Sequence, residues 1–253
     1  MLPEERQNMI VQIVNDVGAA SVKELSARFA ITEDSIRKDL TALQKRGLIR
    51  KTYGGAMRVE DELQERYVAQ RKGKYTLDKQ KIAKKVLRLL RDGELIFLDI
   101  STTNIEVAKL LRTSGMSLTI VTNMVDVMLT MAGDEFNKII FIGGEFGEAR
   151  SGFVGALTNH EIAKYRFDKA FLGVAGVNVA SNSVMTYALD DATTKETIMR
   201  CSKQAYMLLE TRKLSKDGNF VYSSVDNFYG AIVEKDLDEA QQKLFAGYDV
   251  LVI

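Results

Sequence analysis

The sequence predicts an α/β protein, with an N-terminal winged helix-turn-helix followed by a C-terminal α/β domain built on a mostly parallel sheet. Three amphipathic helical patterns and then two short strand patterns fill residues 3–58. From residue 94 onward, apolar runs of strand length alternate with helical patterns. We therefore expect a winged helix-turn-helix at residues 1–58, a linker at 59–76 and a second domain at 77–253.

Three helical patterns open the chain. The first has Pro3 near its start, where the missing N–H of proline costs nothing. The second follows Ser21 and the third follows Thr32, and both residue types are preferred N-caps. The residues on the three apolar faces are Met9, Ile10, Ile13, Val14, Val17, Val22, Leu25, Phe29, Ile36, Leu40 and Leu43. Their spacing predicts three amphipathic helices.

The segment after the third helix predicts a β-hairpin. It reads GLIRKTYGGAMRV and contains two short strand patterns. We expect them to join at Gly54-Gly55, because a glycine pair suits a tight hairpin turn. A hairpin of this kind beside a helix-turn-helix is a wing.

The charge of this region is typical of a surface that binds DNA. Residues 36–58 carry seven Lys or Arg and one acid. A recognition helix places its N-terminal side chains at base edges, so we expect Ser35 and Lys38 to read bases. Cations of the helix and wing are expected mainly at phosphates or in the minor groove. The residues assigned to DNA are Thr32, Ser35, Arg37, Lys38, Arg50, Lys51, Thr52 and Tyr53. A solvated charged helix face is the alternative.

Composition argues against several other classes of protein. The chain has 253 residues, 46% hydrophobic and 27% charged, as in soluble globular proteins. It contains no run of 18 apolar residues and no apolar signal region, so we expect no membrane association. Cys201 is the one cysteine and His160 the one histidine, which argues against disulfides and zinc. We expect a cytoplasmic protein with no metal and no other cofactor.

Charge is spread unevenly along the chain. Residues 1–91 have a net charge of +8 and residues 92–253 a net charge of −7, which points to nucleic acid at one end. Residues 66–91 hold ten basic residues and one acid. This stretch is either a linker that contacts DNA or a basic helix packed on the second domain. Apolar residues from position 77 favour the helix for 77–91.

The second domain shows seven strand patterns with helical patterns between several of them. The strand patterns lie at 94–99, 117–122, 138–144, 169–176, 205–210, 229–234 and 248–253. The helical patterns lie at 102–112, 123–132, 155–164, 190–202 and 237–245. Apolar strands separated by helices predict a mostly parallel sheet covered by helices.

Polar and glycine residues follow several of these strands. In parallel sheets, ligands bind where strand ends meet helix N-termini, whose N–H groups and nearby hydroxyls suit an anion. Glycine lets the backbone approach a ligand closely. The residues assigned to a ligand here are Asp99, Ser101, Thr102, Thr103, Thr122, Asn123, Gly143, Gly144, Gly173 and Gly176. The alternative for each is an ordinary N-cap or turn.

The N-terminal region resembles the DNA-binding domain of the DeoR-type bacterial transcription regulators. The segments that carry the resemblance are ERQ, SVKELSARF, SIRKDL and YGGA. The resemblance implies a protein that binds operator DNA and usually represses sugar-utilisation genes. It also implies release from DNA by a metabolite, commonly a phosphorylated sugar.

The rest of the chain resembles the effector domain of the same family, which is similar in fold to ribose-5-phosphate isomerase and the coenzyme A transferases. The family pattern Asp-x-Gly-Thr-Thr corresponds to residues 99–103, with Ser101 at the glycine position. A later family glycine is Asn182, which tolerates positive φ, so we expect the turn to form there. The resemblance implies that this domain binds the effector. The charged residues added to the effector site are Asp191, Lys195 and Lys213.

We expect the two lysines to contact phosphate or sugar oxygens, and Asp99 and Asp191 to accept hydrogen bonds from hydroxyls. The resulting hypothesis is a ligand-responsive transcription regulator that acts as a homo-oligomer, dimeric or tetrameric, since paired DNA heads match paired half-sites. One alternative is a sugar-phosphate isomerase-like or transferase-like enzyme with a DNA-binding appendage, although no nucleophile–base pair stands out and we assign no catalytic residue. Another is a DNA-bending protein that binds no small ligand.

Overall fold

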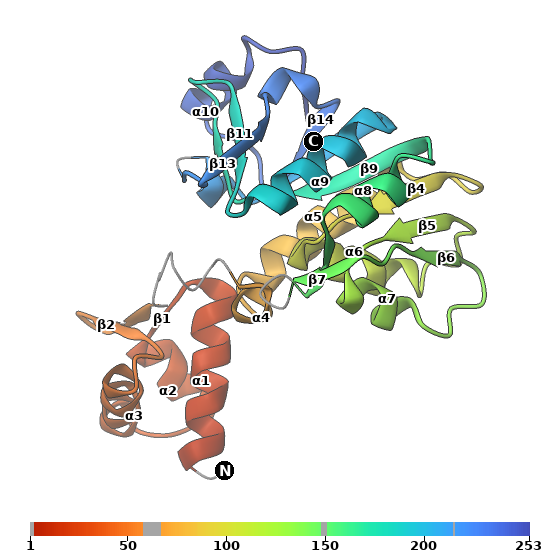
Figure 1. Ribbon diagram of the computed structural model, residues 1–253. Coiled ribbons are helices and arrows are strands. Elements are labelled where there is room, and N and C mark those ends of the chain that lie inside the picture. The colour runs from red at the N-terminus through yellow and green to blue at the C-terminus, as the bar shows by residue number, and fades with distance from the viewer. Residues whose placement is uncertain (1–2, 58–66, 148–150, 215) are drawn as a thin grey trace. The chain divides into compact units, whose positions relative to one another are not determined.

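The computed structural model describes residues 3–57, 67–147, 151–214 and 216–253. The chain divides into two compact units, Met1–Leu77 (unit 1) and Asp78–Ile253 (unit 2). Each unit has a hydrophobic core of its own. Figure 1 shows the helices and strands of both units along the chain.

Residues 3–57 of unit 1 form three helices and a three-stranded antiparallel sheet, which is the winged helix-turn-helix predicted. The elements are α1 (Pro3–Val17), β1 (Ala19–Ser21), α2 (Val22–Phe29), α3 (Glu33–Lys45), β2 (Arg50–Thr52) and β3 (Gly55–Met57). The fully buried side chains of this unit include Ile10, Val14, Leu25, Ile36, Leu40, Leu43 and Ile49. Met9 and Val17 are exposed, so their predicted place on the buried face of the first helix was wrong.

Both predicted N-caps form. The Ser21 side chain accepts the N–H of Glu24 at 3.1 Å, and the Glu24 carboxylate accepts the N–H of Ser21 at 2.8 Å, which completes a capping box. The Thr32 hydroxyl accepts the N–H of Ser35 at 3.3 Å. These caps satisfy N–H groups that the first helical turn leaves without partners.

The hairpin turn lies one residue earlier than predicted. Thr52 pairs with Gly55, so the turn consists of Tyr53 and Gly54, and Gly54 has a φ of 101°. Gly55 belongs to β3, which pairs with both β2 and β1. A Cβ on Gly55 would lie 2.4 Å from the carbonyl oxygen of Ala20 in β1. The second glycine is therefore needed for the close approach of β1, a strand that the sequence analysis missed.

A buried polar contact joins α1 to α3. Asp39 in α3 is buried and accepts from Arg6 Nε at 2.7 Å and from Gln7 Nε2 at 2.9 Å. Arg6 and Gln7 belong to the ERQ segment, and Asp39 belongs to SIRKDL. Two of the four segments that carry the sequence resemblance are therefore hydrogen-bonded to each other. This contact fixes the orientation of α3 relative to α1.

The predicted linker contains ordered structure in its described part. Residues 59–66 lie outside the described residues, as does Arg58. Helix α4 (Val68–Arg71) follows, and the N–H of Tyr75 donates to the carbonyl of Asn15 in α1 at 3.1 Å. The next helix is α5 (Thr76–Leu89), which confirms the predicted basic amphipathic helix.

Unit 2 is built on a seven-stranded sheet whose neighbouring strands are all parallel. The strand order is β15-β14-β12-β9-β4-β5-β6. The bounds are β4 (Leu95–Leu98), β5 (Thr119–Thr122), β6 (Lys138–Phe141), β9 (Phe167–Gly173), β12 (Ser202–Leu209), β14 (Gly230–Val233) and β15 (Leu251–Val252). Each of the seven predicted strands is present, so the mostly parallel sheet is confirmed.

Five predicted helices lie between these strands. They are α6 (Thr102–Leu111), α7 (Val125–Met131), α8 (Ala156–Ile162), α9 (Leu189–Arg200) and α10 (Glu239–Phe245). Helix α6 packs on α7, and α8 packs on α9. The core between helices and sheet is apolar and includes Phe97, Val121, Ala170, Leu172 and Met207.

Two antiparallel additions were not predicted. A three-stranded sheet has the order β10-β11-β13, with bounds β10 (Gly176–Asn178), β11 (Ser183–Thr186) and β13 (Phe220–Ser223). A hairpin pairs β7 (Glu145–Gly147) with β8 (Gly152–Val154). The turn before β11 contains Asn182 with a φ of 52°, which confirms the turn expected there. Within the described residues, no helix has the length and apolar character needed to cross a membrane.

We expect Asp39→Ala to lower the free energy of unfolding of unit 1 by about 2–3 kcal/mol, because it leaves Arg6 and Gln7 without their buried acceptor. Asp34→Ala is the matched control, since the Asp34 side chain is 83% exposed and its ion pair is a surface contact. Urea unfolding followed by circular dichroism measures both variants. Equal effects would show that the α1–α3 contact does not depend on Asp39.

Candidate functional site

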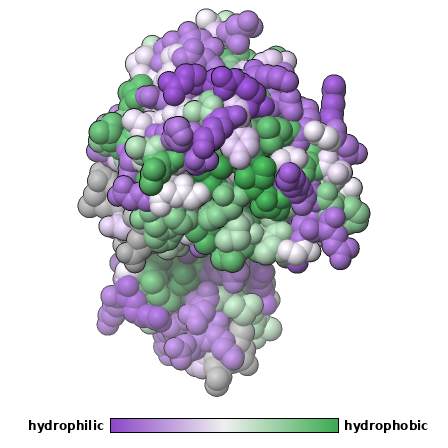
Figure 2. Space-filling model, turned by 45° about the vertical axis from the view of Figure 1, so that its right-hand side comes forward, coloured by the Kyte–Doolittle hydropathy of each residue, from purple (hydrophilic) through white to green (hydrophobic). Residues whose placement is uncertain are grey.

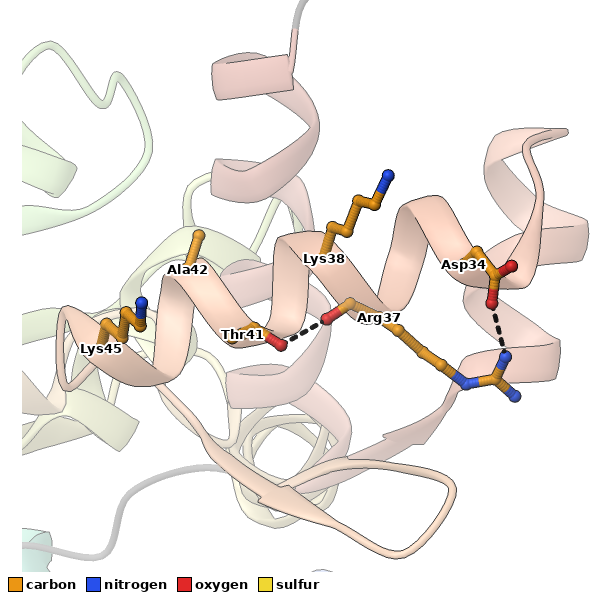
Figure 3. A pocket seen from close by; sticks show the side chains of 6 residues that line it. All are labelled: Asp34, Arg37, Lys38, Thr41, Ala42 and Lys45. Carbon is orange, nitrogen blue, oxygen red and sulfur yellow. Dashed lines mark hydrogen bonds and ion pairs between the residues drawn. The ribbon is translucent and has the colours of Figure 1, made fainter.

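The outer face of α3 forms a shallow groove. Its lining residues are Asp34, Arg37, Lys38, Thr41, Ala42 and Lys45. Figure 3 shows these side chains along one side of the helix, with Lys38 projecting away from it. The opposite side of α3 carries Ile36, Leu40 and Leu43 into the core. The core therefore fixes which residues of α3 face solvent.

Arg37 is engaged by its own helix. Its guanidinium contacts Glu33 at 2.7 Å and Asp34 at 3.0 Å, one turn earlier in α3. These ion pairs are about half exposed, so they add little to stability. They do offset the positive charge of Arg37, which the sequence analysis assigned to DNA as a cation. By contrast, no hydrogen bond or ion pair of Lys38 is found within the part of the chain that the structure describes.

The other helix residue assigned to base reading takes part in the N-cap. Ser35 is partly buried, and its hydroxyl lies 3.0 Å from the hydroxyl of Thr32. Either hydroxyl can donate in this pair, which leaves acceptor positions of both open to solvent. Thr32 itself is exposed.

All four wing residues assigned to DNA are exposed. Arg50 lies along Met57 of the neighbouring strand, with its Nη2 2.8 Å from Sδ. The Lys51 ammonium donates to the Thr41 hydroxyl at 2.9 Å, which connects the wing to α3. Thr52 precedes the turn, and Tyr53 stands fully exposed at its tip. The wing and the groove therefore form one connected surface.

The carboxyl edge of the parallel sheet in unit 2 is organised around Asp99, which follows β4. Asp99 is buried and accepts from the N–H of Gly173 at 3.0 Å and from Asn104 Nδ2 at 2.8 Å. The Lys195 ammonium donates to the same carboxylate. Burial raises the pKa of Asp99 above its ordinary value, and the charge of Lys195 opposes that rise. The structure thus brings together Asp99, Gly173 and Lys195 from three separate motifs.

Ser101 occupies the family glycine position without strain. Its φ of −146° and ψ of 136° are ordinary extended values, and its side chain caps α6 by accepting the N–H of Thr103 at 3.2 Å. Thr102 and Thr103 are buried in the first turn of α6. Opposite them, a Cβ on Gly173 would lie 2.4 Å from Ser101 Oγ. Glycine at position 173 therefore makes room for serine at position 101.

The next two strand ends carry side chains that bind the backbone. Thr122 donates to the carbonyl of Leu98 at 2.7 Å, and Asn123 Nδ2 donates to the carbonyl of Phe153 at 2.7 Å. Gly143 and Gly144 are exposed after β6. Gly144 has a φ of 147°, and a Cβ there would lie 2.0 Å from the Thr158 hydroxyl. Thr122 and Gly144 therefore have structural roles that account for their residue types.

The remaining assigned residues lie near the same edge of the sheet. Asp191 accepts from the Thr186 hydroxyl at 2.5 Å and lies 3.9 Å from the Lys195 ammonium. The Lys213 ammonium donates to the carbonyl of Val174 at 2.9 Å. A Cβ on Gly176 would lie 1.9 Å from the carbonyl oxygen of Lys216, so this glycine is required by close backbone packing.

Lys213 also pairs with a buried acid that we did not assign. Glu210 contacts Lys213 at 2.9 Å and Arg212 at 3.0 Å. Burial alone would raise the pKa of Glu210, but the charges of Lys213, Arg212 and Lys79 hold it well below its usual value. Both lysines expected at a phosphate therefore have carboxylate partners within the protein.

Two residues beside Asp99 were missed. Asn104 was not assigned to the site, although its amide donates to Asp99 and to the carbonyl of Phe171. Tyr222 of β13 is buried, and the Lys195 ammonium lies 5.8 Å from its ring centroid. The residue type of Asn104 after the Ser-Thr-Thr run could have suggested a polar role. Nothing in the sequence placed Tyr222 here, because β13 was not predicted.

Comparison with known families places both units. A model described as "DeoR-like helix-turn-helix domain" matches residues 6–62, and one described as "DeoR C terminal sensor domain" matches residues 75–235. The chain therefore belongs to the DeoR family of DNA-binding transcriptional regulators. The first match implies DNA as a partner, and the second implies a small-molecule effector.

Individual relatives agree with this assignment. The chain is 30% identical over 217 residues to the glycerol-3-phosphate regulon repressor of Escherichia coli (strain K12), covering 86% of this chain and 85% of that protein. It is 28% identical over 219 residues to the lactose phosphotransferase system repressor of Lactococcus lactis subsp. lactis, covering 85% of each. These relatives are repressors, and they support the regulator hypothesis over the enzyme alternative.

Among solved structures, ribose 5-phosphate isomerase A from Methanocaldococcus jannaschii matches with a TM-score of 0.39 and 16% identity, covering 55% of this chain and 53% of that chain. The tetrameric eIF2B-beta2-delta2 complex from C. thermophilum matches with a TM-score of 0.48 and 12% identity, covering 82% of this chain and 64% of that chain.

We expect Gly173→Ala to lower the free energy of unfolding of unit 2 by about 1–3 kcal/mol, because the new methyl group overlaps the Ser101 side chain. Ser101→Gly should restore most of that loss in the double variant, since only the Ser101 Cα, at 3.6 Å, would then face the methyl group. Thermal unfolding of the two single variants and the double variant measures the coupling. Additive effects would contradict the close contact between these two residues.

Proposed function

We propose that this protein represses sugar-utilisation genes by binding operator DNA, and that a phosphorylated sugar bound in unit 2 controls this binding. The observation that carries the proposal is that one chain contains two parts. The first is a winged helix with exposed basic residues, and the second is a sensor domain with polar residues at the carboxyl edge of its sheet. The names of the relatives support it, because one is a glycerol-3-phosphate regulon repressor and another a lactose phosphotransferase system repressor. We further infer that the protein acts in the cytoplasm, where operator DNA lies.

In the proposed complex, α3 enters the major groove and the wing follows the backbone. Lys38 is the base reader best supported by the geometry, since it projects from α3 without a partner among the described residues. Ser35 supplies a second polar contact near the helix start. Arg37 contacts phosphate or the minor groove only by leaving Glu33 and Asp34. Thr32 and the wing residues 50–53 complete the surface.

In the proposed effector complex, the ligand lies at the carboxyl edge of the sheet, around Asp99. Asp99 and Asp191 accept hydrogen bonds from hydroxyls, and the residues that follow β4, β5, β6 and β9 surround the ligand. Lys195 and Lys213 attract a phosphate while exchanging contacts with their carboxylate partners. The start of α6 adds N–H groups oriented toward an anion.

We propose that unit 2 also forms the homo-oligomer. Figure 2 shows hydrophobic side chains gathered on one face of unit 2. The ring of Phe146, which is half exposed, lies 5.4 Å from that of Phe153, and Phe141 packs against Phe153 as well. A partly exposed aromatic cluster is typical of a surface that pairs with another chain. Two copies related by symmetry would present two winged helices to two half-sites.

Control by the effector requires that ligand and DNA favour different states of the oligomer. A coupling free energy of about 1–3 kcal/mol changes DNA affinity by roughly 5- to 150-fold. The test is fluorescence anisotropy with labelled DNA from upstream of this protein's own gene, repeated with a panel of sugar phosphates. Selective binding that one compound weakens supports the proposal. Binding that is no tighter than to random DNA contradicts the proposed operator binding. Selective binding that no compound alters contradicts the proposed control by a sugar phosphate.

We expect Lys38→Ala to weaken binding to the selected operator by about 1–3 kcal/mol and to change affinity for random DNA much less, because Lys38 is proposed to read a base. Lys84→Ala is the matched control, since Lys84 is an exposed lysine of α5 outside the winged helix. Anisotropy titrations on both DNAs measure the difference. Equal losses on operator and random DNA would make Lys38 a phosphate contact instead.

A further inference from the structure

Three buried polar atoms near Asp99 have no hydrogen-bond partner among the described residues. They are Asn104 Oδ1, Asn123 Oδ1 and the hydroxyl of Tyr222. The three residues are at most 4% exposed. Leaving a buried polar atom without a partner costs about 1–3 kcal/mol, so such atoms point to a partner that arrives from outside the protein.

The orientation of both amides is fixed by their neighbours. Asn104 Nδ2 donates to the carboxylate and carbonyl oxygens of Asp99 and to the carbonyl of Phe171, at 2.8–3.1 Å. Asn123 Nδ2 donates to the carbonyl of Phe153. Reversing either amide would place its oxygen against these acceptors. In both amides, the atom without a partner among the described residues is therefore the oxygen, which accepts hydrogen bonds.

Each of the three residues is linked to Asp99 through a contact or through the strand register. Asn104 contacts Asp99 directly. Leu98 is the register partner of Thr122 in the parallel pair β4–β5, so Asn123 follows β5 beside Asp99. Tyr222 lies beside the Lys195 ammonium, which donates to Asp99. Burial, with the nearby charges of Asp99 and Asp191, raises the pKa of Tyr222 well above its ordinary value, so its hydroxyl keeps its proton.

The chemistry of these atoms indicates which part of a ligand they can bind. Two amide oxygens need hydrogen-bond donors, and the oxygens of a phosphate monoester supply almost none at neutral pH. A sugar or polyol hydroxyl can donate to an amide oxygen and also accept from a phenol. The cations at this edge are held by carboxylates, Lys195 by Asp99 and Lys213 by Glu210, so the open positions are neutral.

We propose that Asn104, Asn123 and Tyr222 form a subsite that binds the hydroxyl groups of a polyhydroxy effector and selects it over simple phosphates. This inference rests on the proposed function, since it assigns the hydroxyl-bearing end of the effector to a place in unit 2. It gives Asn123, already assigned to the site, a specific role, and it adds Asn104 and Tyr222 to the site. Tyr222 carries the sharpest test, because its hydroxyl makes no contact that the fold needs.

The experiment compares Tyr222→Phe with the unaltered chain. Without ligand, the variant should keep or slightly raise Tm, because it removes a buried hydroxyl that has no partner. Isothermal titration calorimetry is first carried out on the unaltered chain with three probes, D-ribose 5-phosphate, D-fructose 1-phosphate and sn-glycerol 3-phosphate. It identifies which of these probes the unaltered chain binds. We expect about tenfold weaker binding of that probe to the variant and no change for methyl phosphate or inorganic phosphate.

Tyr248→Phe is the matched control. The Tyr248 hydroxyl donates to the carbonyl of Val179 at 2.7 Å, so this variant loses a hydrogen bond that the fold uses. It should lower Tm and leave the affinity for the same probe unchanged. The pair of variants thus separates a ligand contact from a structural one.

The outcomes separate this inference from the function on which it rests. Equal affinity of the unaltered chain and Tyr222→Phe, or a lower Tm of Tyr222→Phe without ligand, would overturn the subsite while leaving the sugar-phosphate effector in place. No binding of any polyol phosphate by the unaltered chain would overturn the proposed effector class, and the subsite with it. Selective DNA binding, measured separately, would stand in either case.

Discussion

The buried ion pair between Asp99 and Lys195 connects the elements that meet at the carboxyl edge of the parallel sheet in unit 2. Through Asp99, β4 is joined to β9 by the Gly173 N–H, to α6 by Asn104 and to α9 by Lys195. Breaking a buried pair by removing one partner costs about 3–5 kcal/mol, because a charge is left unpaired. A ligand that shifted this pair would therefore change the contacts of two strands and two helices at once. In the proposed function, this pair is where a bound effector acts on the contacts between these elements.

Unit 1 uses a similar constraint to orient its DNA-facing helix. Asp39 is the buried acid of α3, and Arg6 and Gln7 hold it from α1. The other acids of α3, Glu33 and Asp34, lie on the solvent side and hold Arg37. Carboxylates of one short helix thus perform two tasks, docking the helix and restraining a cation on its outer face. Lys38, on the same face, can reach a ligand without first losing a partner among the described residues.

The sequence was sufficient to predict elements whose pattern is local. Alternation of apolar runs and helical faces predicted the seven parallel strands, and the caps at Ser21 and Thr32 predicted two helix starts. It could not predict contacts made by short strands far apart in the chain. The turn at Tyr53 and Gly54 was misplaced because Gly55 is required by the unpredicted strand β1. Tyr222 was missed because β13 pairs with β11, 34 or more residues earlier. The Asp99 partner of Lys195 lies 96 residues earlier in the chain, so this pair depends on three-dimensional packing that local spacing does not encode. Glu210, by contrast, lies only three residues before Lys213.

At the carboxyl edge of the sheet in unit 2, the charged groups have partners among the described residues of the protein, whereas several neutral groups do not. The carboxylates and ammonium groups contact one another and the backbone, so much of their hydrogen-bonding capacity is used inside the protein. The amide oxygens and the phenol that remain open are neutral. Neutral groups can be buried without a ligand at a cost of about 1–3 kcal/mol each, whereas an unpaired buried charge would cost far more. A sensor domain must stay folded when no ligand is bound. The fold can tolerate this state because the groups left without a partner among the described residues of this edge are neutral and not charged.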